Sequence, residues 1–64
     1  MTPQEKAKQL VDKFIVFVEA YTSDGQLNNA KICALIAVDE VLELNHHHSD
    51  YDWWMEVKHE IKKL

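Results

Sequence analysis

The residues with the clearest capacity for chemistry are three consecutive histidines, His46, His47 and His48, followed by Asp50 and Asp52. Imidazole and carboxylate groups are ligands for zinc and similar ions. Adjacent residues of a loop project in diverging directions, however, whereas ligands on a helix are spaced by about four residues so that they share one face. We therefore interpret this segment as a solvated polar loop in which metal binding is at most adventitious.

A second group of polar residues, Asp39, Glu40 and Glu43, follows an apolar run, and carboxylates can act as general acid and base. Such catalysis requires a cleft that gives the carboxylates unequal environments, and a stripe on a helix surface provides none. The sequence also contains no serine–histidine–acid arrangement, paired-cysteine motif, glycine-rich loop or HExxH motif. We expect a protein that is not an enzyme and that holds no cofactor.

Aromatic and basic residues offer a different kind of site. Tyr51, Trp53 and Trp54 are suited to stacking on a nucleobase, with Lys31 or Lys58 meeting a phosphate. The tryptophans are equally suited to anchor a core, although two adjacent tryptophans are hard to bury fully in so short a chain. Both roles stay open: core packing for the pair, and contact with a ligand or partner for at least one aromatic of this segment.

Composition narrows the class of partner. The chain has 64 residues and a formal net charge of −4, which disfavours a large contact with the phosphate backbone of duplex nucleic acid. The single cysteine, Cys33, excludes a disulfide within the chain, and we interpret it as a buried thiol of a cytoplasmic protein. No apolar segment is long enough to span a bilayer, and the first residues lack the pattern of a secretory signal, so we expect no membrane contact.

The apolar periodicity predicts an all-α fold, a single small domain of three helices at about residues 3–21, 29–44 and 50–63. Thr2 has the features of a helix cap, because proline follows it and glutamate stands three residues later. Gly25 indicates a turn. Asn28 or Asn29 would cap the second helix, and Ser49 or Asp50 the third. The predicted core faces comprise Ala7, Leu10, Val11, Phe14, Phe17, Val18 and Tyr21, then Cys33, Ala34, Ala37, Val38, Val41 and Leu42, then Trp53, Trp54, Val57, Ile61 and Leu64.

The second predicted helix contains seven consecutive apolar residues, from Ile32 to Val38. Ile32 and Ile36 lie on the stripe opposite its core face. A three-helix chain of this length can cover only part of a helix that is apolar all round, so we expect this helix to be the most buried and a second copy to cover the stripe. Val16, on the polar side of the first helix, is a further candidate for the interface. These observations predict a homo-oligomer.

Three segments carry a resemblance to known proteins. The segments Ala7–Phe14, Lys31–Glu40 and Trp54–Leu64 resemble a family of short proteins encoded by phages and prophages of gut bacteria, which share the patterns AKxCALIAVDE and WxEVKxEIxxL. The histidine loop and Trp53 depart from the pattern. The resemblance brings no catalytic residue, but it implies a context: small phage proteins often blunt host defence by gripping a host protein or by sequestering a nucleotide immune signal.

We therefore expect an oligomeric accessory factor of the host bacterial cytoplasm that sequesters a small anionic nucleotide. The alternatives are a module that docks on and inhibits a host protein, or a minor structural phage component. A pocket with two or more lysines would favour the first, and a flat exposed apolar patch the second. The expected ligand residues are Lys31, Lys58, Tyr51, Trp53 and Trp54, and the expected interface residues are Val16, Ile32 and Ile36.

Overall fold

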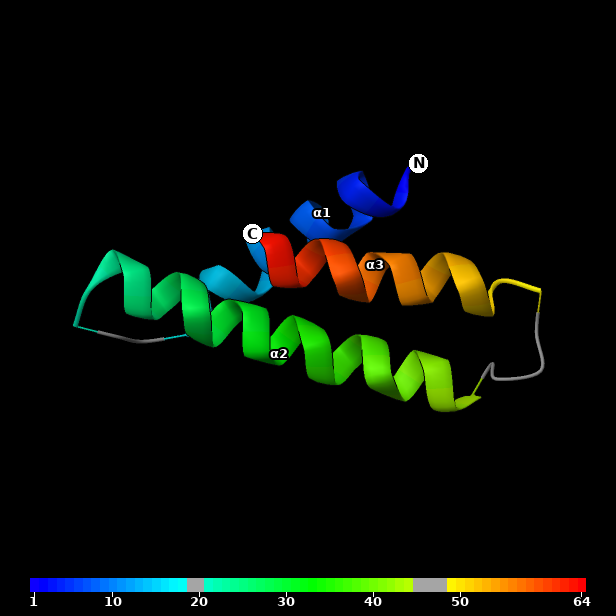
Figure 1. Cartoon of the computed structure of the whole chain (residues 1–64). Helices are drawn as coiled ribbons and strands as arrows, with labels where there is room; N and C mark the ends of the chain where they lie inside the picture. The colour runs from blue at the N-terminus through cyan, green and yellow to red at the C-terminus, as the bar shows by residue number, and fades with distance from the viewer. Residues whose placement is uncertain (19–20, 45–48) are drawn as a thin grey trace.

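The computed structural model describes residues 1–18, 21–44 and 49–64, which form three helices and no strand (Figure 1). Helix α1 spans Pro3–Ile15, α2 spans Ser23–Leu44 and α3 spans Tyr51–Lys63. Each helix packs against the other two, and α3 runs back along α2 (Figure 1). The all-α, three-helix prediction is confirmed. No helix in these ranges is both long and apolar enough to cross a membrane.

Helix α1 begins where the sequence predicts, because Thr2 and Glu5 cap each other. The Glu5 backbone N–H donates to Thr2 Oγ1 at 3.1 Å, and the Thr2 backbone N–H donates to Glu5 Oε1 at 3.0 Å. This reciprocal pair satisfies two N–H groups at the helix start, which have no acceptor within the helix itself. Pro3 at the first helical position gives up no hydrogen bond.

Helix α1 ends at Ile15, so its predicted continuation to residue 21 is wrong. The Phe17 backbone N–H bonds to the Phe14 carbonyl at 2.9 Å in a tight final turn. β-branched and aromatic residues dominate positions 14–18, and their restricted rotamers lower helix propensity. As a result Phe17 and Tyr21, predicted as core, are exposed, while Val18 still packs against the core.

Helix α2 begins at Ser23, so the predicted start at residue 29 and the predicted turn around Gly25 are both wrong. Thr22 caps this helix in place of Asn28 or Asn29: its Oγ1 accepts from the Gly25 backbone N–H at 3.0 Å, and its carbonyl accepts from the Gln26 N–H at 3.0 Å. Gly25 lies inside the first turn and does not have a positive φ.

Helix α3 begins at Tyr51. Asp50, one of the two predicted caps, stands at the position immediately before it, but its side chain makes no capping hydrogen bond with the helix. Lys62 and Lys63 lie in its last turn, where positive charge stabilises the negative end of the helix dipole. Leu64, predicted on the core face, is exposed instead.

The core is a column of apolar side chains shared by the three helices. Eight of the residues that the structure describes are buried in it; the sequence predicts seven of these and misses one alanine, at the start of the second predicted helix. Cys33 is half-buried, so the prediction of a buried thiol is only partly correct. The buried residues are Ala7, Val11, Ala30, Ala34, Val38, Leu42, Val57 and Ile61.

Candidate functional site

A hollow between α2 and α3 contains two of the five expected ligand residues. Tyr51 and Lys58 line it together with Met55, on one face of α3, while α2 supplies the facing wall. Its volume is about 550 Å³, but it is shallow and widely open to solvent, unlike the enclosing clefts that bind most small molecules. The full lining is Asp39, Leu42, Glu43, Tyr51, Met55 and Lys58.

The charge of this hollow is unfavourable for an anion. Lys58 Nζ lies 2.8 Å from Asp39 Oδ1, so the ammonium already has a carboxylate partner. Glu43 adds a second carboxylate to the lining. Among the residues that the structure describes, an incoming phosphate would meet two carboxylates and one ammonium group, and it would have to displace Asp39 from Lys58.

The two tryptophans pack toward the core and not into that hollow. Their rings meet edge to face, with centroids 5.1 Å apart and planes at 86°, a favourable aromatic geometry. Trp53 and Trp54 are both half-buried against the core cluster. Trp54 also borders a separate space of about 110 Å³ where the three helices meet, beside Lys6 and Leu10. That space is smaller than the roughly 300 Å³ of a typical ligand pocket.

Lys31 lies on a third surface, apart from the hollow and from the tryptophans. Its Nζ donates to the Lys62 backbone carbonyl at 3.4 Å, at the C-terminal end of α3, where a cation offsets the helix dipole. Lys62 is eleven residues from Tyr51, or about 16 Å along the helix. Within one chain the five expected ligand residues therefore lie on three separate surfaces, and Lys31 and Lys58 do not converge.

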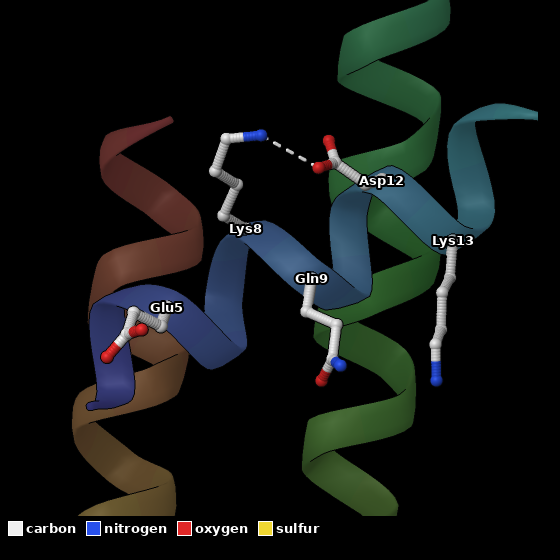
Figure 2. A pocket seen from close by; sticks show the side chains of 5 residues that line it. All are labelled: Glu5, Lys8, Gln9, Asp12 and Lys13. Atoms are coloured by element: carbon white, nitrogen blue, oxygen red, sulfur yellow. Dashed lines mark hydrogen bonds and ion pairs between the residues drawn. The ribbon is translucent and has the colours of Figure 1, made fainter. Parts of the chain in front are cut away.

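A further hollow, which the sequence reasoning did not single out, lies on α1 alone (Figure 2). In Figure 2 the Lys8 side chain points toward Asp12, with 2.8 Å between Nζ and Oδ2. Gln9 and Lys13 extend from the opposite side of α1 in this view. Both partners of the pair are largely exposed, so the pair contributes little to stability. The spacing of charges three and four residues apart was a visible signal for it.

Glu5 also lines this surface, and its chemistry is explained by the helix cap. Hydrogen bonds from the Thr2 backbone N–H and the Thr2 hydroxyl hold the pKa of the Glu5 carboxyl below its ordinary value of 4.5. Both donors stabilise the ionised form of the carboxyl. The lowered pKa of Glu5 reflects its structural role, because the carboxylate is hydrogen-bonded to Thr2 at the start of α1.

The exposed apolar residues of α2 lie where the sequence predicts. Ile32 is 48% exposed and Ile36 is 59% exposed, one turn apart on the side opposite the buried column. Val16, the third expected interface residue, is exposed just after α1. Gln26 Nε2 donates to the Ile15 carbonyl at 2.8 Å, and this bond holds the end of α1, with Val16 after it, beside the first turns of α2.

The sequence reasoning missed part of this apolar surface. Phe17 is 82% exposed and Tyr21 is fully exposed, at the connection between α1 and α2. Leu44 is 83% exposed at the opposite end of α2. The signal that could have revealed Phe17 and Tyr21 was the cluster of β-branched residues before them, which argued against a continuous helix.

The expected histidine loop, His46 to His48, lies outside the described residues, so its interpretation stays a prediction. Elsewhere in the described chain, no three histidine, cysteine or acidic side chains are grouped in a way that could hold a metal ion. Comparison with known proteins finds no matching family model, no matching curated protein and no matching solved structure. What the chain does must be inferred from its own surfaces.

Proposed function

We propose that this chain is a non-enzymatic binding protein that acts as a homo-oligomer. The observation that carries the proposal is the pair Ile32 and Ile36, exposed one above the other on α2, with Val16 and Phe17 beside the first turns of the same helix. Contiguous exposed apolar side chains on a small protein mark interaction sites. In the oligomer a second copy would cover this surface, and α2 would become the most buried helix.

The accessible surface supports the same conclusion. The chain exposes 4631 Å², whereas a monomeric protein of 7.5 kDa exposes about 4,200 Å². The difference is roughly a tenth of the surface. The elongated shape of 40 × 19 × 15 Å accounts for part of this excess, and the exposed apolar side chains of α2 lie on the same surface.

The ligand proposed for the oligomer is a small anionic nucleotide, with Lys31 or Lys58 on the phosphate and Tyr51, Trp53 or Trp54 on the base. The hollow beside Tyr51 is large enough for part of such a ligand. Because its own cation is paired with Asp39, the proposal requires the ligand phosphate to compete with that carboxylate for Lys58. With the resemblance to phage proteins, we propose that the chain is an accessory factor of the host bacterial cytoplasm that sequesters an immune signal.

A second candidate, docking on a host protein, is favoured by two specific observations. The carboxylates of Asp39 and Glu43 in the hollow oppose an anion, and the exposed rings of Phe17 and Tyr21 are of the type that anchors protein interfaces. In this alternative the apolar surface that a second copy does not cover would bind the host protein.

Self-association is tested with Ile36→Glu. A carboxylate at this position would be buried without a partner in the oligomer, at a cost of several kcal/mol, and would be solvated in the single chain. We expect sedimentation to show smaller species with unchanged helicity. Gln4→Glu adds the same charge at an exposed position of α1 and should leave the assembly intact. A folded monomer for the unmodified chain at micromolar concentration would refute the proposal.

Ligand binding is tested by calorimetric titration with a panel of cyclic and linear nucleotides. Lys58→Ala or Lys31→Ala should weaken binding about tenfold or more, because a hydrogen bond to a charged group contributes about 1.5–3 kcal/mol. The melting curve should change little. Lys8→Ala, on the far surface of α1, serves as the matched control. If no nucleotide gives binding heat and the immobilised chain recovers a host protein, the nucleotide proposal is wrong and the second candidate function is favoured.

A further inference from the structure

We infer that the partner on the exposed face of α2 is the α2 helix of a second copy, packed antiparallel and related by a two-fold axis that crosses this face at the level of residue 34. This inference rests on the proposed self-association and specifies its geometry. It follows from the order of residues along the exposed face, from the charge at one end of that face, and from the apolar groups at its two ends.

The exposed face of α2 is a single stripe. At 100° per residue its members fall within about 80° of one another, opposite the buried column of Ala30, Ala34 and Val38. An antiparallel pair centred on residue 34 places Ile32 of each copy against Ile36 of the other. The stripe comprises Gly25, Asn29, Ile32, Ile36, Glu40 and Glu43.

The charge of the stripe disfavours a parallel pair. Glu40 and Glu43 form its C-terminal half, and the stripe contains no basic residue. A parallel pair would set Glu40 beside Glu40 and Glu43 beside Glu43, which is repulsive. An antiparallel pair separates the two acidic ends and brings each one to the N-terminal turns of the other α2, where the backbone N–H groups carry partial positive charge. Asp24 of that first turn lies about 100° from Gly25 around the helix, outside the stripe. Glu43 would then lie opposite Gly25, whose missing side chain leaves room for the carboxylate.

The apolar groups at the two ends of α2 also match in the antiparallel arrangement. Leu44 would be level with Asp24 of the second copy, which lies on the other edge of that helix, and on the same edge as Gln26, whose side chain bonds to the Ile15 carbonyl. Val16 and Phe17 follow directly after Ile15, so they would lie at the same end of the pair as the exposed Leu44 side chain. In a parallel pair the same groups would be about 27 Å apart, the length of eighteen helical residues.

The register is tested by disulfide formation between two single-cysteine variants, both made in a Cys33→Ala background. Asn29→Cys is mixed with Glu40→Cys under mild oxidation. The antiparallel register brings these two positions together on the same edge of the interface, near the Cβ separation of about 3.5–4.5 Å that a disulfide requires. We expect the mixed disulfide to form roughly a hundredfold faster than in the control, because the interface raises the effective thiol concentration. The control mixes Asn29→Cys with Lys63→Cys, which lies on α3 away from the stripe.

The outcomes separate the geometry from the proposed function. If the unmodified chain and the Cys33→Ala chain sediment as monomers, self-association and this inference both fail. If they are oligomers but Asn29→Cys or Glu40→Cys forms disulfides only with itself, the parallel arrangement holds and the inference alone fails. If they are oligomers and neither kind of disulfide exceeds the control, the interface lies elsewhere and the inference is overturned as well.

Discussion

Lys58 on α3 and Asp39 on α2 form an ion pair, with 2.8 Å between Nζ and Oδ1, at the edge of the hollow that contains Tyr51. The Lys58 side chain is 28% exposed and the Asp39 side chain 52%. The pair therefore has two consequences. It connects two helices through a partly solvated contact, and its Asp39 carboxylate already binds the Lys58 ammonium that an anionic ligand would need.

The first prediction concerns the energy of this pair. A double-mutant cycle with Lys58→Ala and Asp39→Ala should give a coupling of about 0.2–1 kcal/mol, because solvent screens a pair this exposed. The free energy of unfolding is measured by urea denaturation at low and high salt, and the coupling should fall as salt increases. A coupling above about 2 kcal/mol, insensitive to salt, would contradict the picture of a solvated pair.

The second prediction concerns the start of α1. Thr2→Ala removes the hydroxyl that accepts from the Glu5 backbone N–H, and we expect a loss of about 1 kcal/mol in the free energy of unfolding. Thr2→Ser keeps a hydroxyl in the same place and should retain most of the stability. Equal stability of Thr2→Ala and the unmodified chain, measured by chemical denaturation, would mean that the cap is not formed in solution.

The third prediction is a pH dependence that follows from Glu5. The pKa of its carboxyl is lower in the folded chain than its ordinary value of 4.5, so the ionised form favours folding. The stabilisation is complete above pH 4.5 and is lost as the pH falls through the lowered pKa. The melting temperature of the unmodified chain should exceed that of Glu5→Gln at pH 7, and the gap should narrow by pH 3. A gap that is constant with pH would show that the charge of Glu5 is irrelevant.

The fourth prediction tests the junction between α1 and α2. Gln26 Nε2 donates to the Ile15 carbonyl in a partly buried place, so Gln26→Leu should cost about 0.5–1.5 kcal/mol. Gln26→Glu should cost more, because a carboxylate oxygen would then face a carbonyl oxygen. The two variants have nearly the same volume as glutamine, so thermal denaturation compares hydrogen bonding and not packing. If Gln26→Glu is the more stable variant, the hydrogen bond is absent in solution.

The fifth prediction is that folding does not require a metal ion. The His46 to His48 segment lacks the ligand spacing of a structural site, so a chelator should leave helicity and melting temperature nearly unchanged. A structural zinc would instead make folding dependent on metal. Circular dichroism with and without EDTA is the measurement, and a large loss of helical signal would overturn this interpretation.

The sequence predicts the fold class and the start of α1 because these depend on short-range patterns. Thr2, Pro3 and Glu5 together specify a cap, and the spacing of Val57 and Ile61 specifies the buried face of α3. The end of α1 and the start of α2 depend on individual side-chain hydrogen bonds. Thr22 caps α2 and Gln26 holds the end of α1, and neither contact follows from periodicity.

The candidate site was predictable only in part. Ile32 and Ile36 are exposed as expected, because the helical wheel determines which side of α2 they occupy. The expected ligand residues illustrate the limit: Lys58 forms an ion pair with a carboxylate on another helix, and Lys31 reaches a carbonyl at the far end of α3. Side-chain partners across helices depend on how the helices pack, which a linear pattern does not specify.

The unequal lengths of the helices determine where the native chain opens first. Lys31 lies beside the end of α3, so the turns of α2 before it extend past α3 and are supported mainly by α1 (Figure 1). Amide hydrogens in these first turns will exchange with solvent through local fraying, while those around Val38, enclosed by both neighbours, will exchange only when the whole chain unfolds. The part of α2 nearest Phe17 is thus the least protected, and a partner that bound there would slow its exchange most.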